Sequence, residues 1–163
     1  MKGLRALLAC GLLFVPGVHA CGLTSRLVPF DVPPQASLVP AEDLPAPIVQ
    51  VSQIVRGIGS SHINCDDTGL LTLQVEWPRG KHRLRDLGFE FSVPHADPPY
   101  PMFPEGPVQA PVEGRRSDFV FMWQEGPPEQ QVFIDMQLEV RAVTREGQRG
   151  PAARVLVRSP PGG

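Results

Sequence analysis

Apolar and polar residues alternate strictly along several short stretches of this chain. The clearest stretch is 71–77, where Leu, Leu, Val and Trp alternate with Thr, Gln and Glu. Successive side chains of an extended strand point to opposite faces, so a period of two predicts a strand with one buried face. The same alternation predicts further strands at 48–55, 87–93, 119–123, 132–142 (one long strand or two in series) and 153–157.

Turn-forming residues occupy the intervals between these stretches. Gly, Pro, Asp and Asn recur there, and no segment shows the 3.6-residue period of an amphipathic helix. About six short strands separated by turn signals are typical of an all-β fold. We therefore predict a single antiparallel β-sandwich over residues 47–159.

Two of the predicted strand regions resemble parts of a fibronectin type III domain, which is an immunoglobulin-like β-sandwich. Residues 71–77 resemble its second strand, which ends in a core tryptophan, and residues 138–157 resemble its closing hairpin. The resemblance implies that Trp77 is a core residue. The sequence departs from the family at Met136, where those domains usually carry a tyrosine, and at 94–117, which is longer and richer in proline.

The first 20 residues have the layout of a secretory signal peptide. Lys2 and Arg5 give a positive start, and residues 6–15 form an apolar run too short to span a bilayer. Val18 and Ala20 then provide a small-residue cleavage site. We predict that residues 1–20 are removed and that the chain is exported.

Cys21 directly follows this cleavage site. The run Ala20-Cys21-Gly22 resembles the signal of bacterial exported lipoproteins, although His19 departs from the small or hydroxylated residues usual there. The resemblance implies lipidation of Cys21 and, because Gly22 rather than Asp follows, an outer-membrane anchor. The alternative is simple cleavage, a periplasmic or secreted protein, and a Cys21–Cys65 disulfide. The two exclude each other because both use the Cys21 sulfur.

Prolines without any period fill residues 21–46, the segment between the leader and the predicted domain. Pro-rich chain lies extended, which predicts a semi-rigid tether over 21–46. The alternative is a strand at the domain edge formed by residues 26–30, since proline suits edge strands. Residues 160–163 are predicted to be a disordered C-terminal tail.

The charge balance argues against one class of partner. The chain has 15 Lys and Arg against 17 Asp and Glu, a formal net charge of −2. Nucleic-acid-binding domains usually carry an excess of basic residues, so no nucleic-acid partner is predicted. No cofactor is predicted either.

One triplet resembles a catalytic motif. Asp67-Thr68-Gly69 matches the triplet of aspartic proteases, whose mechanism needs two such loops facing each other so that two carboxylates share a proton. The chain has one copy, and Asp and Gly also form turns. A turn before a strand explains the triplet without catalysis.

The residues just before the triplet include metal-ligand types. His62, Cys65 and Asp66 could supply two or three zinc ligands, but a complete site needs more. His82 and His95 are the only other histidines after the leader, and both lie in polar or Pro-rich stretches. A small secreted hydrolase or metal-binding protein using residues 62–67 is therefore the alternative function, with no catalytic or metal residue assigned.

A Pro-rich segment, 94–111, interrupts the predicted strands. It holds seven prolines together with Tyr100, Met102 and Phe103. Such a segment can present aromatic side chains to a partner groove. The alternative is that these side chains cover the edge of the sandwich.

These observations together predict a non-enzymatic, envelope-anchored or exported module for protein interaction or structural support. Its membrane contact is the lipid on Cys21, and its partner is an envelope protein or polymer that meets Tyr100, Met102 and Phe103.

Overall fold

The computed structural model describes residues 25–33, 43–58, 67–94, 102–111 and 114–162. Within these residues the chain forms seven strands and two single-turn 3-10 helices, so the predicted all-β class is confirmed. The strands are β1 (Ile48–Val55), β2 (Thr68–Glu76), β3 (Gly88–Ser92), β4 (Val108–Gln109), β5 (Arg116–Gln124), β6 (Ile134–Val143) and β7 (Ala153–Ser159). The helices are η1 (Leu84–Asp86) and η2 (Pro128–Gln130).

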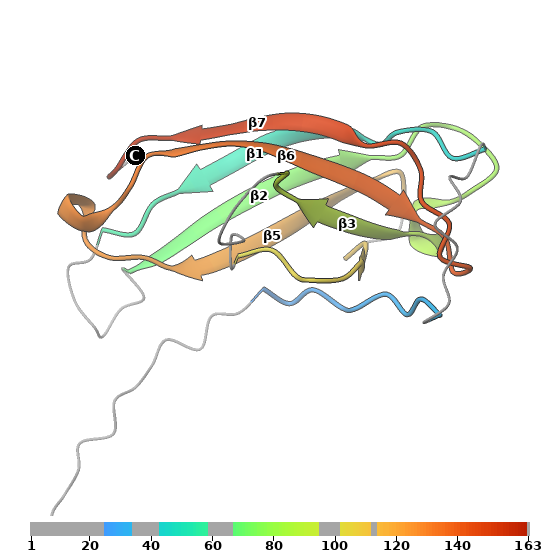
Figure 1. Ribbon diagram of the computed structural model, residues 1–163, viewed down its shortest axis with the longest axis horizontal. Coiled ribbons are helices and arrows are strands. Elements are labelled where there is room, and N and C mark those ends of the chain that lie inside the picture. Colours follow the sequence, from blue (N-terminus) through green and yellow to red (C-terminus); the bar gives the residue numbers. More distant parts are fainter. Residues whose placement is uncertain (1–24, 34–42, 59–66, 95–101, 112–113, 163) are drawn as a thin grey trace, which may run out of the picture.

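The strands pair into two antiparallel sheets, in the order β1-β2-β5 and β4-β3-β6-β7 (Figure 1). The longest uninterrupted pairing joins β2 to β5, from Thr68 opposite Gln124 to Glu76 opposite Arg116. The strands therefore run along the long axis of the molecule (Figure 1). The β2–β3 connection and the β6–β7 hairpin lie at one end of that axis, and η2 lies at the other.

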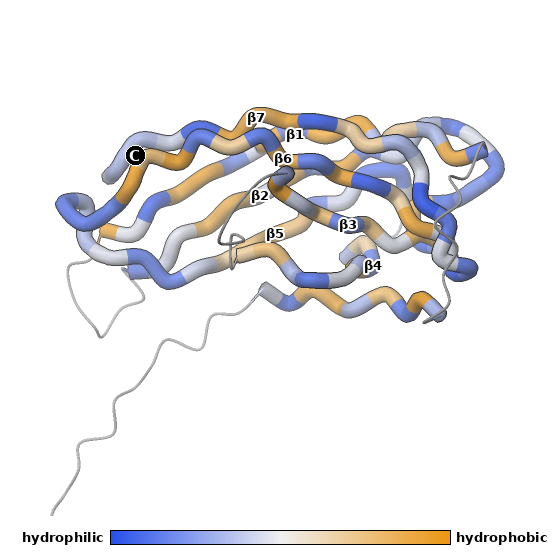
Figure 2. Tube along the Cα trace, in the orientation of Figure 1, coloured by the Kyte–Doolittle hydropathy of each residue, from blue (hydrophilic) through white to orange (hydrophobic). Residues whose placement is uncertain are grey.

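Aromatic side chains from the two sheets meet in the core. Phe91 of β3 lies with its ring centroid 5.0 Å from Phe119 and 4.8 Å from Phe121 of β5. Hydropathy alternates along most strands in Figure 2, because each strand turns its apolar face toward the opposite sheet. Trp77, at 2% exposure, lies in the same buried cluster, which confirms its predicted core position.

Several strand boundaries differ from the prediction, and β2 and β5 each begin three residues earlier, at Thr68 and Arg116. The predicted strand at 132–142 begins at Ile134 instead, and Val132 and Phe133 remain 77% and 55% exposed. The Pro-rich segment contains β4, a strand of two residues that pairs with β3 at Phe89 and Val108. Two residues are too few to show an alternation, so this strand has no signal in the sequence.

A segment before β1 closes one side of the two sheets. We call Ser25–Phe30 the strap. At its start, the Met122 N–H of β5 donates to Ser25 Oγ at 2.9 Å, and at its end the Phe30 N–H donates to the Pro107 carbonyl at 2.8 Å. Between them, Pro29 forms a β-bridge with Val108 of β4. The strap thus spans from β5 to β4.

Close packing holds the strap in place. Phe30 is 5% exposed and lies against Gly88, where a Cβ atom would stand 2.4 Å from the ring. Leu44, just before β1, is also part of the core. The predicted tether over 21–46 is therefore corrected for its described parts, 25–33 and 43–46. The alternative edge placement of residues 26–30 is the one observed, because apolar side chains among the prolines are buried.

The C-terminal residues are also attached to the domain. The Arg56 guanidinium donates to the Pro160 carbonyl at 3.0 Å, and the Gly162 N–H donates to Gln131 Oε1 at 2.8 Å. The predicted disordered tail over 160–163 is corrected for 160–162 by these bonds. The predicted signal peptide, Cys21 and Cys65 lie outside the described residues. No helix in the described part is long and apolar enough to cross a membrane.

Candidate functional site

The connection between β2 and β3 concentrates basic side chains. Residues 79–85 read Arg-Gly-Lys-His-Arg-Leu-Arg. Leu84 and Leu87 are buried in the core and fix the connection from below. The Trp77 indole N–H donates to the His82 carbonyl at 3.0 Å, which holds the loop from its other side. The basic side chains are therefore carried on an anchored loop.

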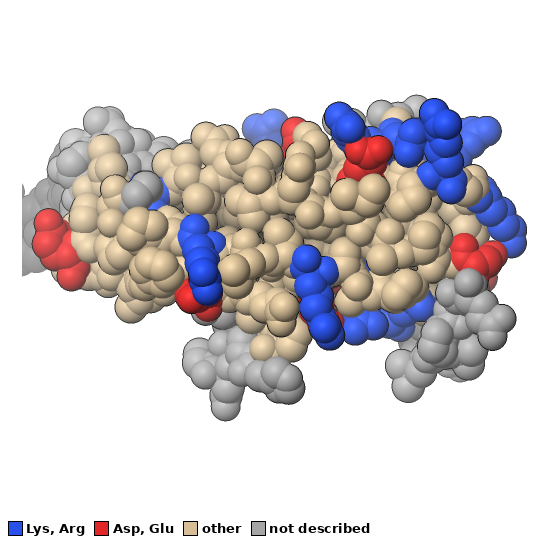
Figure 3. Space-filling model, turned by 90° about the horizontal axis from the view of Figure 1, so that it is seen from above, with Lys and Arg blue, Asp and Glu red and all other residues tan. Residues whose placement is uncertain are grey.

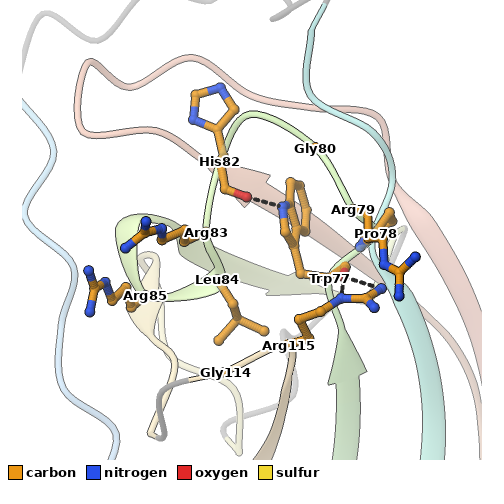
Figure 4. Close-up of a pocket in the computed structure, with 10 residues that line it drawn as sticks. All are labelled: Trp77, Pro78, Arg79, Gly80, His82, Arg83, Leu84, Arg85, Gly114 and Arg115. Carbon is orange, nitrogen blue, oxygen red and sulfur yellow. Dashed lines mark hydrogen bonds between the residues drawn. The ribbon is translucent and has the colours of Figure 1, made fainter.

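These side chains surround a pocket of about 390 Å³. Figure 4 shows Trp77 and Leu84 near its centre, with Arg83 and Arg85 on one side and Arg79 and Arg115 on the other. None of the lining residues that the structure describes carries a carboxylate. The pocket therefore has an apolar floor and a cationic rim.

Two of the four arginines have their charge compensated nearby. Arg115 donates to the Trp77 carbonyl at 3.3 Å and lies 3.5 Å from a Glu76 oxygen. Arg85 Nε lies 3.9 Å from the Asp86 carboxylate. The side chains of Arg79 and Arg83, by contrast, are exposed, and neither guanidinium group forms an ion pair or hydrogen bond with any residue that the structure describes. The Arg83 carbonyl accepts a hydrogen bond from the Asp86 N–H at 3.0 Å.

Acidic groups lie beside the pocket and are occupied by neighbouring cations. Lys81 Nζ contacts Asp43 Oδ2 at 3.0 Å, and this hydrogen bond lowers the pKa of Asp43. His82 Nε2 lies 3.6 Å from the same oxygen, too far for a hydrogen bond, and is buried without another partner among the described residues. The side chain of Glu76 binds Arg116 at 2.7 Å. The nearby carboxylates thus do not neutralise Arg79 or Arg83.

The pocket belongs to a basic end of the molecule. We define the basic end as residues 78–86, 114–116 and 145–149, which come together where β2 and β6 end and β5 begins. Most of the blue side chains in Figure 3 gather toward this end, at the right of the view. The near-neutral total charge of the chain hides this segregation.

Arginine chemistry indicates what such a pocket can bind. A guanidinium presents five N–H donors in a rigid plane that matches carboxylate, phosphate and sulfate groups. Arg149, which is paired with Glu90, illustrates this geometry. Its Nε and Nη2 atoms donate to the Glu90 carboxylate oxygens at 3.0 and 2.7 Å, and these hydrogen bonds raise the pKa of Arg149. Arg79 and Arg83 offer the same donors to an oxyanion from outside the chain.

The triplet Asp67-Thr68-Gly69 begins β2 at the end opposite the pocket. Asp67 Oδ2 accepts a hydrogen bond from the Gln124 side chain at 2.9 Å, and its carbonyl accepts one from the Glu125 N–H at 2.6 Å. A Cβ atom at Gly69 would stand 2.2 Å from the Trp123 ring, so close packing requires the glycine. In the described residues, these contacts are those of a strand start.

The other candidate ligands of that region, His62, Cys65 and Asp66, lie outside the described residues. Within the described part of the chain, no group of three His, Cys, Asp or Glu side chains could hold a metal ion. The side chain that contacts Asp67 among the described residues is that of Gln124.

Two of the three residues of the predicted interaction loop pack against the domain. Met102 is 8% exposed and belongs to the core cluster. The Phe103 ring stacks edge-on against Phe121 with centroids 5.0 Å apart. Both side chains bury apolar surface against the core, because burial of that surface is more favourable than its exposure to water. Tyr100 lies outside the described residues.

The end opposite the basic end is built around a buried ion pair. Arg56 Nε donates to Glu125 Oε1 at 2.8 Å, with the two side chains 1% and 9% exposed. Burial raises the pKa of Glu125, but hydrogen bonds from Arg56, the Gly57 N–H and Trp123 outweigh it, so the pKa lies below its usual value. We call the exposed side chains around this pair, Ile58, Val132 and Phe133, the apolar end.

Sequence reasoning missed the basic pocket, although a signal was present. The run at 79–85 is dense in basic residues, but the run alone does not predict a pocket. The pocket forms because Arg115, at least 30 positions later in the sequence, lies beside this run in the folded chain. Comparisons of the chain with protein-family models, with curated proteins and with solved structures give no match.

Proposed function

We propose that this chain is the precursor of a bacterial exported lipoprotein, a non-enzymatic β-sandwich module of the fibronectin type III-like kind. In this proposal Cys21 holds the module at the outer membrane, and the basic pocket binds an anionic polymer of the cell envelope. The observation that carries the proposal is the pair Arg79 and Arg83, two exposed guanidinium groups on an anchored loop with no charge partner among the described residues, beside a pocket whose described lining has no carboxylate.

The strand order supports the fibronectin type III part of the proposal. Seven strands divide into three and four, and β4 pairs with β3. In immunoglobulin constant domains the fourth strand instead joins the sheet of the first, second and fifth strands. Pairing of the fourth strand with the third is the arrangement that the resemblance to fibronectin type III domains implies.

Hydrogen bonds from the arginine side chains to an anion support the proposal that the pocket binds one. Charge-assisted hydrogen bonds to guanidinium groups contribute about 1.5–3 kcal/mol each, more than neutral ones. A polymer with repeated oxyanions meets several of these groups at once, which multiplies the effect. A solvated pair of arginines contributes little to folding when it has no partner among the described residues, so binding is the role that supports the proposal best.

The binding proposal predicts a loss of affinity when the uncompensated arginines are removed. The double variant Arg79→Ser/Arg83→Ser should bind polyphosphate about a hundredfold more weakly, because two contacts are lost and each is worth about 1.4 kcal/mol or more. Fluorescence anisotropy with labelled polyphosphate at increasing salt measures this, and the salt dependence of the remaining binding should be shallower.

A matched control removes equal charge elsewhere. Arg154 and Arg158 of β7 pair with Glu139 and Asp135 on the surface. The variant Arg154→Ser/Arg158→Ser should bind polyphosphate nearly as well as the parent. Equal weakening by both double variants would show that net charge, and not the pocket, attracts the anion. A labelled polygalacturonate run in parallel separates phosphate from carboxylate recognition.

The anchoring proposal predicts an acylated N-terminus. Intact-mass measurement of the protein from its native host should show the acyl groups on Cys21, and Cys21→Ser should move the protein from the membrane fraction to the soluble fraction. An unmodified Cys21 bonded to Cys65 would overturn the anchor in favour of the disulfide alternative. Cys65→Ser serves as the control, since it removes the disulfide and leaves the acylation site.

A further inference from the structure

We propose that the apolar end, formed by Ile58, Val132 and Phe133, lies against the lipid bilayer surface while the basic end points away from it. This inference rests on the anchoring at Cys21 proposed above. It adds an orientation and a second membrane contact, neither of which the acyl chains by themselves require.

The apolar end presents three large side chains to solvent. Ile58, Val132 and Phe133 are 61%, 77% and 55% exposed. Backbone contacts place them in one region, since Arg56 donates to the Val132 carbonyl at 2.9 Å and the Gln131 side chain donates to the Gly57 carbonyl. Exposed neighbouring apolar side chains of this size mark a contact with another apolar phase.

The chain length upstream of the strap limits where a lipid on Cys21 can lie. Ser25 follows Cys21 by four positions, so their Cα atoms are at most about 14 Å apart in any conformation. Ser25 is fixed to Met122, which is two residues from the end of β5 at Gln124. A lipid at Cys21 therefore keeps this region of β5 close to the bilayer.

The direction of the strap selects the end that meets the bilayer. From Ser25 beside Met122, the strap runs along the molecule to Phe30 beside Pro107, away from η2 and toward the basic end (Figure 1). The chain thus reaches the domain from the side of the apolar end. The basic end is farther, because the six residues from Met122 back to Arg116 span about 20 Å of strand.

Few charges among the described residues lie at the apolar end. Arg56 and Glu125 neutralise each other inside the domain, and Glu129 of η2 is exposed. Inserting Val132 and Phe133 into the headgroup region removes apolar surface from water, and the tether raises their local concentration at the bilayer. The pocket at the basic end then faces the envelope space, where a polymer can reach it.

The two tryptophans of the chain report on the two ends. Trp77 lies beneath the basic pocket, and Trp123 lies in β5 near the apolar end, next to Gly69. The mature chain with Cys65→Ala is coupled through Cys21 to a maleimide lipid in vesicles of phosphatidylethanolamine and phosphatidylglycerol. Vesicles with brominated acyl chains quench tryptophans that lie close to the bilayer. This coupling works whether or not the native host acylates Cys21.

Brominated vesicles should reduce the emission of Trp123, measured in Trp77→Phe, and leave the emission of Trp77, measured in Trp123→Phe, unchanged. The variant Val132→Ser/Phe133→Ser should lose the quenching, whereas the control Leu156→Ser on exposed β7 should keep it. Equal quenching of both tryptophans, quenching of Trp77 alone, or quenching that survives the double variant would overturn the orientation.

Two further measurements distinguish a folding defect from a wrong orientation, and a wrong orientation from a missing anchor. If Trp77→Phe does not fold, the Trp123 signal is obtained by comparing the parent with Trp123→Phe. Failure of native acylation appears in the intact mass of Cys21 and overturns the anchor, whereas failure of the orientation appears only in the quenching pattern of the coupled protein.

Discussion

Replacing Arg56 with methionine should lower the free energy of unfolding by about 3–5 kcal/mol, because removal of one partner leaves a buried charge uncompensated. Arg56 donates to Glu125 and to the carbonyls of Val132, Ser159 and Pro160. A methionine fills much of the volume but satisfies none of these acceptors. Urea unfolding followed by circular dichroism measures the change.

The double variant Arg56→Met/Glu125→Leu tests the cause. Replacing a whole buried pair with apolar residues is often neutral, so the part of the loss that comes from the uncompensated charge should return. The carbonyls of Val132, Ser159 and Pro160 lose their donor in both variants, and this part of the loss should remain. The exposed pair of Arg158 with Asp135 provides a second control, since Arg158→Met should change stability by less than about 1 kcal/mol. A single variant Arg56→Met as stable as the parent would contradict the structural role of the pair.

The same pair gives the domain an acid-sensitive contribution to stability. The pKa of Glu125 is lower in the folded protein than its usual value, so the folded state favours the ionised carboxylate. This contribution is present above the unfolded pKa, near 4.3, and is lost as the pH falls through the folded pKa. Unfolding measured from pH 6 down to about pH 3 should therefore show a smaller acid dependence in Arg56→Met/Glu125→Leu.

Replacing Trp77 with alanine should lower the free energy of unfolding by about 3–5 kcal/mol. Trp77 is 2% exposed and packs edge-on against Phe89 with ring centroids 6.1 Å apart. The truncation removes this apolar contact and leaves a cavity beneath the basic loop. Thermal or urea unfolding of the purified domain is the measurement.

Trp77→Phe separates packing from loop placement. It keeps an aromatic ring in the core but removes the indole N–H that donates to the His82 carbonyl. We expect a smaller loss of stability, about 1–2 kcal/mol, together with weaker polyphosphate binding as the loop loosens. An alanine variant as stable as the parent would show that Trp77 is not the core residue that its burial indicates.

Much of the fold could be predicted from the sequence because most strands have one face in the core and one in solvent. The segment Ile48–Val55 was predicted with its observed bounds, and the alternation of 71–77 marked most of β2. At Val132 the alternation continues but the backbone does not pair, so the strand was predicted to start too early. Proline content at 25–33 indicated a spacer, whereas Phe30 is buried through contacts with β3 and β4 that no local pattern shows.

The candidate site was harder to predict because its parts are distant in sequence. The segments chosen from sequence, 62–67 and 94–111, stood out by composition. Met102 and Phe103 then proved to be packing residues, since an apolar side chain in a Pro-rich segment looks the same whether it meets a partner or its own core. Predicting the basic pocket would have required the pairing register of β2 with β5, because that register places Arg115 beside Trp77.

The strap also implies an order of events during folding. It precedes every strand in the sequence, yet Ser25 binds Met122, which lies 97 positions later. Contacts between residues so far apart form slowly, so we expect the strap to dock after the sheets have begun to pair. Until then the outer edges of β4 and β5 are open to strands of neighbouring molecules. We therefore expect this protein to be most exposed to aggregation between pairing of the sheets and docking of the strap.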